Sequence, residues 1–192
     1  MTASARREQL LDVTTLIIAE AGFQAVSIQS VARRAGISRP IVYEHFGDLS
    51  GLLEALVERE VERALDQVAE TELVDLSEGD PSELMLESLR AYLDAVAQHP
   101  TTWQLVLMPP EGAPELLRTS IISGRAEVLS RLAQAVRPIS TPPRQMPDPE
   151  LTARILSAVA DEYARLLLTD ASQFPPERLL PHARWWIERL SP

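Results

Sequence analysis

The stretch SVARRAGISRPIVYEHF, residues 30–46, decides the fold of this chain. It contains three arginines, a tyrosine and a histidine around a single glycine, in a chain of 192 residues with a formal net charge of −10. Ser27 is a good N-cap for a short helix, and Gly36 suits the left-handed conformation that ends it. Ser38 can cap a second short helix with Pro40 in its first turn. This pattern predicts a helix-turn-helix.

The rest of the chain shows helical periodicity and no convincing strand alternation. An amphipathic helix is expected from Arg6 to Ala21, before the helix-turn-helix, and a long helix follows over residues 49–70. Further helices are expected at residues 81–98, 103–107, 115–136, 150–169 and 176–190, and proline-rich loops at 108–114 and 138–149. We therefore expect an all-α protein of about nine helices.

Composition restricts the compartment and the chemistry. The chain has no cysteine, which excludes disulfides, thiolate metal sites and cysteine nucleophiles. No segment approaches the ~20 apolar residues of a membrane span, and the N-terminus lacks the apolar core of a signal peptide. We expect a soluble cytoplasmic protein without a membrane partner.

Charge is distributed unevenly along the chain. Residues 1–46 carry five arginines and four acidic residues, a balance of +1, which leaves −11 for the remaining 146 residues. Because an acidic surface repels nucleic acid at long range, contact with DNA is expected only in the N-terminal part.

The N-terminal residues resemble the TetR family of one-component transcriptional regulators. The shared anchors are Ala21-Gly22, Ser27-Ile28, Val31-Ala32, Ala35-Gly36-Ile37-Ser38 and Tyr43-Glu44-His45-Phe46. The match covers about residues 6–57 at the family's spacing, and beyond it the likeness is one of architecture only. The resemblance implies a helix-turn-helix DNA-binding domain of three helices over residues 1–48 and a helical effector-binding and dimerisation domain over 49–192.

The resemblance also implies a function. It suggests a homodimeric regulator, in most cases a repressor, that binds a palindromic double-stranded DNA operator and is released by a small-molecule effector, with no cofactor. The alternative is a helix-turn-helix architectural or global DNA-binding factor without a ligand. We do not expect an enzyme, because the three histidines lie in separate segments and no catalytic or phosphate-binding motif is present.

Four polar residues match positions at which the family contacts phosphates: Ser27, Ser38, Tyr43 and His45. Such contacts use side-chain donors and capped helix ends. Two of these residues keep another interpretation, because Tyr43 also suits a core position and His45 suits the last turn of a helix, where it interacts with the dipole.

Base contacts are expected at the start of the second short helix. Arg39 can donate two hydrogen bonds to O6 and N7 of guanine, with a phosphate contact as the equal alternative. Pro40 and Ile41 suit a thymine methyl group, and Ile41 can instead pack against the first helix. Two departures from the family pattern, Glu44 and Leu49, reduce the expected attraction to phosphates.

The effector site implied by the resemblance has apolar and polar candidates. Trp103, Leu107, Met108, Ile122 and Tyr163 are candidate lining residues, although each also suits the plain core. Arg118 is a candidate for binding a carboxylate, or a solvated arginine.

Glu162 falls between Leu151, Ile155 and Leu166 on a helical wheel, inside an apolar stripe. Because an unpaired buried carboxylate is costly, Glu162 either pairs with an arginine, faces a dimer seam or contacts an effector.

The final helix offers apolar area for a homodimer. The candidate interface residues are Leu179, Trp186, Ile187 and Leu190, with Leu180 and Trp185 in the same apolar set. Packing within the protomer can use part of that area.

Overall fold

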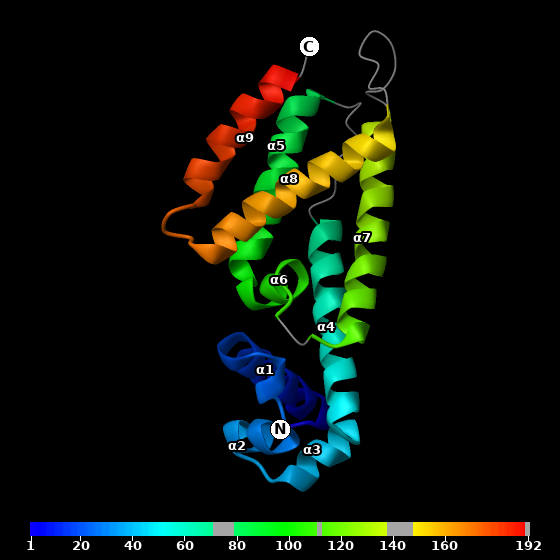
Figure 1. The fold of residues 1–192 in the computed structure, drawn as a ribbon, viewed down its shortest axis with the longest axis vertical. Helices are drawn as coiled ribbons and strands as arrows, with labels where there is room; N and C mark the ends of the chain where they lie inside the picture. The colour runs from blue at the N-terminus through cyan, green and yellow to red at the C-terminus, as the bar shows by residue number, and fades with distance from the viewer. Residues whose placement is uncertain (71–78, 111–112, 138–147, 191–192) are drawn as a thin grey trace.

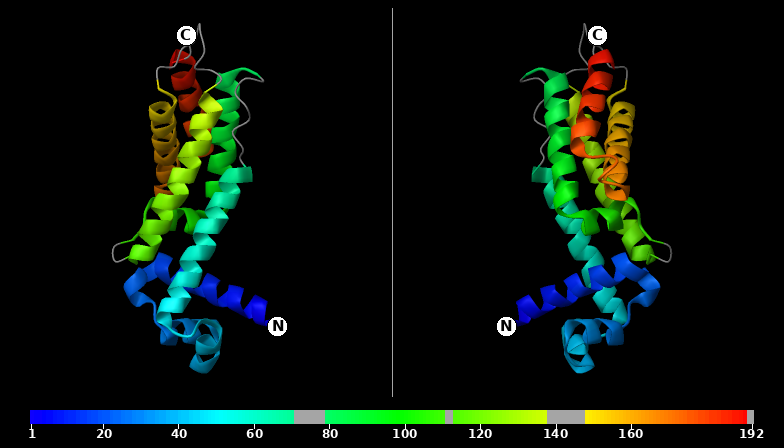
Figure 2. Two further views of the ribbon diagram at one scale, coloured as in Figure 1. Left: turned by 90° about the vertical axis from the view of Figure 1, so that its right-hand side faces the viewer. Right: turned by 90° about the vertical axis from the view of Figure 1, so that its left-hand side faces the viewer.

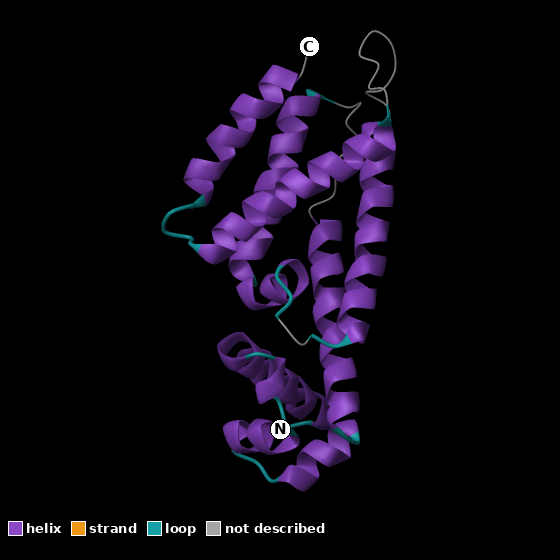
Figure 3. Cartoon of the chain, viewed as in Figure 1, coloured by secondary structure: helices purple, strands orange, loops and turns teal. Residues whose placement is uncertain are grey.

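A computed structural model describes residues 1–70, 79–110, 113–137 and 148–190 of the chain. Over these residues every regular element is helical (Figures 1 and 3). The α-helices are α1 (Ala3–Ala21), α2 (Ile28–Ala35), α3 (Arg39–Phe46), α4 (Leu49–Glu70), α5 (Pro81–Gln98), α6 (Pro100–Leu107), α7 (Glu115–Val136), α8 (Pro149–Thr169) and α9 (Pro176–Leu190), with one 3-10 turn, η1 (Phe23–Ala25). The expected all-α fold is confirmed.

Caps place the helix ends close to their predicted positions. The Thr2 hydroxyl accepts from the amide of Ala5 at 3.2 Å, so α1 begins at Ala3 rather than at Arg6. Gly36 ends α2 with φ 69°, a conformation that glycine adopts without strain. Asp148 accepts from the amides of Glu150 and Leu151 at the start of α8. Most of the predicted loop over residues 138–149, and Glu111 and Gly112 of the other loop, lie outside the described residues.

The N-terminal helices pack around the first half of α4. Their shared cluster buries Leu10, Ile18, Val31, Val42 and Leu52 almost completely. It also includes Leu105, Ala113 and Leu117 from α6, the following loop and α7. Figure 2 shows α1 extending to one side of α4, while α2 and α3 form the end of the molecule opposite the C-terminus.

The remaining helices form a second lobe around the C-terminal half of α4 (Figure 1). α5, α6, α8 and α9 share a cluster that includes Leu93, Val96, Trp103, Ala164 and Leu179. α8 crosses this lobe obliquely and packs against α5, α6 and α7 (Figure 1). The predicted division of the chain between residues 48 and 49 remains a prediction.

Within the part of the chain that the structure describes, none of the helices combines the length and the apolar character that crossing a bilayer requires.

Candidate functional site

α3 presents one face to the core and the other to solvent. Val42 is fully buried and fixes the helix against its neighbours, while Arg39, Pro40 and Glu44 are exposed. Tyr43 is 50% exposed, so it is not a core residue. One side of α3, with Arg39, Pro40, Tyr43 and Glu44, is therefore open to solvent at the end of the molecule, as base or phosphate contacts require.

The two capping serines differ in what their hydroxyl groups do. Ser27 accepts from the amide of Ser30 at 3.0 Å, and Ser30 accepts in return from the amide of Ser27 at 2.9 Å, which completes a capping box. Ser38 occupies the N-cap of α3 without a side-chain capping bond. Both serines are exposed, so both hydroxyls can be reached by a phosphate.

The other predicted DNA-contacting residues are partly buried. Ile41 and His45 are of intermediate exposure, and the His45 ring lies 6.2 Å from the Phe46 ring in the last turn of α3. Both of their alternative roles stay open. Arg34 is held on α1 by paired hydrogen bonds of 2.5 and 2.6 Å to Glu20, whereas Arg39 points away from the core. The structure thus brings all seven candidates to one end, and their contact with DNA remains a prediction.

A cavity of about 680 Å³ lies in the second lobe, between α4, α5, α6, α7, α8 and α9. This volume falls within the range of small-molecule sites. Three of the predicted lining residues contribute to its wall: Trp103, Leu107 and Tyr163. Most other lining side chains are aliphatic, including Val61, Leu65, Leu89, Ile121 and Val128.

The cavity wall includes a buried carboxylate, Asp161. Its side chain accepts from the Tyr92 hydroxyl at 3.2 Å and from the guanidinium of Arg125. Asp161 is 7% exposed, whereas the Arg125 side chain is 43% exposed. Burial raises the pKa of Tyr92 well above its ordinary value, and the neighbouring Asp161 raises it further. Tyr92 therefore stays protonated and donates to Asp161.

Four predicted effector residues lie outside the cavity wall. On α7 the inward positions are Leu117, Ile121 and Gly124, so Arg118 is exposed and Ile122 is 69% exposed. Met108 follows the end of α6 and is 41% exposed, beside a small separate hollow. The inward face of α7 is one residue away from the one expected, so Arg118 and Ile122 lie outside this cavity wall, as does Met108, and their contact with an effector stays a prediction.

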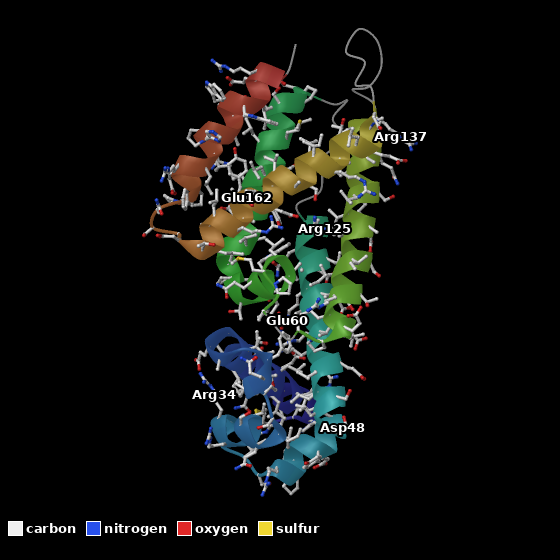
Figure 4. All side chains as sticks on the ribbon, in the orientation of Figure 1. Arg34, Asp48, Glu60, Arg125, Arg137 and Glu162 are labelled. Atoms are coloured by element: carbon white, nitrogen blue, oxygen red, sulfur yellow. The ribbon has the colours of Figure 1, made fainter. Side chains whose placement is uncertain are left out.

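Glu162 is the fourth predicted effector residue outside the cavity wall, and the packing of α8 explains its position. The helix has two apolar stripes: an inner one with Ala153, Ala164 and Leu167, and an outer one with Leu151 and Ile155. Glu162, labelled in Figure 4, belongs to the outer stripe. Its side chain is 63% exposed, and it pairs with Arg165 at 3.4 Å. In the described protomer Glu162 is therefore not buried and pairs with an arginine, and its place at a dimer seam stays a prediction.

α9 turns the predicted dimer residues inward. Leu179 is 4% exposed within the second-lobe cluster, and Trp186 and Ile187 line the cavity. α9 packs this face against α5, where Arg184 forms paired hydrogen bonds with Glu83. Leu179, Trp186 and Ile187 thus pack at least partly within the protomer, their place at a dimer interface stays a prediction, and the Leu190 side chain lies outside the described part. Trp185, by contrast, is 51% exposed.

A buried polar junction joins the two lobes at Glu60 of α4, labelled in Figure 4. Its side chain is 1% exposed and accepts from Arg59 and from Thr102 of α6. Arg59 also reaches α1, with its guanidinium 3.0 Å from Glu8 and 2.9 Å from Asp12. The lobe that contains the cavity is thereby tied to the first helix of the helix-turn-helix unit.

The sequence predictions missed Asp161, Arg125 and Tyr92. Asp161 is one residue from Glu162, and at 100° per residue it falls at the edge of the inner stripe of α8, nearer to Ala164 than to the outer stripe. The sequence analysis identified only the stripe with Leu151, Ile155 and Leu166, whereas the packing of α8 buries the other one. An acidic residue at the edge of the small-residue stripe was the available signal.

An all-α protein with a helix-turn-helix at one end and a cavity in a second helical lobe defines a class of DNA-binding regulators. Residues 10–56 match the family described as bacterial regulatory proteins, tetR family. The chain belongs to the TetR family of transcriptional regulators, whose members are not enzymes.

Individual relatives agree with this assignment. The chain is 38% identical over 93 residues to the HTH-type transcriptional regulator BetI of Yersinia pestis (strain Pestoides F), covering 48% of this chain and 42% of that protein. It is 30% identical over 135 residues to BetI of Cronobacter sakazakii, covering 69% of this chain and 66% of that protein. The matched part thus spans about two fifths of the length of the first of these relatives. A TetR-like regulator from Rhodococcus sp. RHA1 shares the fold with a TM-score of 0.75 at 20% identity, over 98% of this chain and 97% of that one.

Proposed function

We propose that the protein is a ligand-responsive repressor that binds a palindromic operator as a homodimer. The observation that carries this proposal is the combination of an exposed α3 face at one end with a large apolar cavity in the other lobe. In this proposal Arg39, Pro40 and Ile41 read bases, while Ser27, Ser38, Tyr43 and His45 hold phosphates. Such a protein acts on DNA in the cytoplasm.

The dimer is proposed to form through the outer stripe of α8 together with α9. Leu151 is 54% exposed, Ile155 49% and Trp185 51%, and exposed apolar surface of this kind is typical of protein interfaces. A two-fold dimer places its recognition helices one helical turn of DNA apart, ~34–36 Å, or a multiple of it.

The effector is proposed to act through α6. Trp103 lines the cavity, and its neighbour Thr102 binds the Glu60 carboxylate that Arg59 connects to α1. A ligand that moves α6 would favour one position of the helix-turn-helix unit over another, which shifts the population of the DNA-binding state. The architectural alternative, by contrast, assigns no role to this cavity.

Selection of genomic fragments by the purified protein tests the proposal, with the bound DNA read by sequencing at physiological salt. A small number of palindromic sites supports an operator-binding repressor. Many dispersed sites without a common palindrome would instead support the architectural alternative, and the absence of any enrichment would argue against DNA binding by this helix-turn-helix unit.

A further inference from the structure

The charged centre of the cavity indicates the chemistry of its ligand. Asp161 is the most deeply buried charged residue of the described lining, and both of its carboxylate oxygens accept hydrogen bonds, from Tyr92 and from Arg125. A buried carboxylate must keep a cationic or hydrogen-bonding partner. Any ligand that reaches this point therefore has to preserve or replace those partners.

The two partners of Asp161 differ in how easily they can leave. The Tyr92 ring packs edge to face on Trp103 with 5.0 Å between centroids, which holds the hydroxyl in place. The Arg125 side chain is 43% exposed, so its guanidinium can withdraw into water. Another cation can therefore replace Arg125 at the carboxylate of Asp161, which itself stays in place.

The lining favours a positive over a negative head group. Both arginines of the described wall already bind a carboxylate: Arg125 binds Asp161, and Arg131 binds Glu127. An anionic ligand near Arg125 would lie beside Asp161 and compete for the same guanidinium, which is repulsive. A cationic ligand would restore the charge balance that Arg125 provides.

Aromatic residues in the wall favour the same sign of charge. Tyr92, Trp103, Tyr163 and Trp186 all line the cavity, and ring faces attract cations. The chain as a whole is acidic, with a net charge of −10, so its field attracts cations rather than anions. The remaining aliphatic wall suits an apolar body.

We infer that the cavity takes an amphiphile with a protonated amine, whose ammonium group displaces Arg125 and binds Asp161 while its apolar body packs against the aliphatic and aromatic wall. A protonated amine has N–H donors, so it replaces the hydrogen bond that Arg125 gives up. This inference rests on the proposed function in one respect, that the cavity is the effector site.

The test compares three probes of similar chain length and different head groups: decylamine, decanoic acid and 1-decanol. Binding to the full chain is measured by isothermal titration calorimetry without DNA, below the concentrations at which the probes aggregate. Decylamine is expected to bind about tenfold or more tightly than either other probe, because a charge-assisted hydrogen bond accounts for that much affinity. Preference for decanoic acid, equal binding of all three, or no binding would overturn the inference.

Variants separate the head-group site from general apolar binding. Asp161→Asn should remove the preference for decylamine and leave 1-decanol unchanged, while Glu162→Gln, the adjacent carboxylate on the outer stripe, should behave like the wild type. Arg125→Met keeps Asp161 and should strengthen decylamine binding, which gives a second reading if Asp161→Asn does not fold. Weaker decylamine binding in Arg125→Met would contradict the exchange of cations.

The same probes distinguish this inference from the proposed function. If decylamine binds through Asp161 but does not release the selected operator, the ligand class stands and the repressor mechanism fails. If decanoic acid or 1-decanol releases the operator while decylamine does not bind, the repressor mechanism stands and the ligand class is wrong.

Discussion

The hydroxyl of Thr102 on α6 donates a 2.5 Å hydrogen bond to the carboxylate of Glu60 on α4, in a part of the structure where both residues are buried. The adjacent Trp103 donates from its indole nitrogen to Gln67 of α4 at 2.8 Å and also lines the cavity. α6 is therefore fixed to α4 by two side-chain hydrogen bonds, one of which ends at the junction with α1. In the proposed mechanism, a ligand that moves the cavity wall at Trp103 would therefore act on this junction.

Thr102→Val should destabilise the fold by about 1.5–3 kcal/mol, because it leaves one oxygen of a buried carboxylate without its donor. Urea unfolding followed by circular dichroism measures the change. Thr119→Val is the matched control, since the exposed Thr119 hydroxyl binds only a carbonyl of its own helix, and it should change stability little. Equal stability of both variants would show that the Thr102 bond contributes nothing.

Arg39→Ala should weaken operator binding by roughly 1–3 kcal/mol and relax the preference at one base pair, if Arg39 reads a guanine. Fluorescence anisotropy with the selected operator and its single-base variants measures both effects. Arg90→Ala removes an exposed arginine from α5, far from the helix-turn-helix unit, and should bind as the wild type does. A uniform loss over all sequences would assign Arg39 to a phosphate instead.

Gly51→Ala should destabilise the junction of α3 and α4 by about 1–3 kcal/mol, the usual cost of inserting an atom into occupied space. A Cβ at this position would lie 2.2 Å from the carbonyl oxygen of Phe46. Thermal unfolding measures the effect. Gly124→Ala on α7 is the comparison, because its nearest neighbour would be a Leu65 methyl at 3.4 Å and the helix gains propensity. Similar melting temperatures would refute the steric argument.

Tyr92→Phe should reduce the loss of stability at alkaline pH. Burial and Asp161 raise the pKa of Tyr92 in the folded state. The protonated hydroxyl therefore contributes fully to the free energy of unfolding below the pKa of the unfolded chain, about 10, and this contribution is lost as the pH rises from there through the folded pKa. The variant lacks this ionisation, although it also loses the hydrogen bond to Asp161 at neutral pH. Urea unfolding from about pH 8 to about pH 11 compares the two slopes, and parallel curves would contradict the assignment.

Ile155→Glu should convert the proposed dimer into monomers, because it places a charge in the middle of the outer stripe of α8. Size-exclusion chromatography with light scattering measures the mass. Ile122→Glu makes the same change at an even more exposed position of α7 and should leave the dimer intact. If Ile155→Glu stays dimeric, the seam lies elsewhere on the protomer.

Local signals predicted the helices well. Serine, aspartate, glycine and proline at helix ends act through bonds to the nearest backbone groups, so positions such as Ser27, Gly36 and Asp148 can be interpreted without a tertiary structure. The anchors of the helix-turn-helix lie within one short stretch, and the family match over residues 10–56 agrees with them. The cavity residues were harder, because they come from helices far apart in the chain.

The sequence by itself therefore determined the all-α fold, the helix-turn-helix and the family, since each follows from local periodicity, caps and short-range spacing. Only the tertiary structure decided which stripe of α8 faces inward, and with it the exchange of Glu162 for Asp161 as the carboxylate of the cavity. The same holds for α9, where packing on α5 turns Trp186 inward and leaves Trp185 exposed. The physical reason is that a helix with two apolar faces gains free energy by burying either one, and the neighbouring helices determine which face is covered.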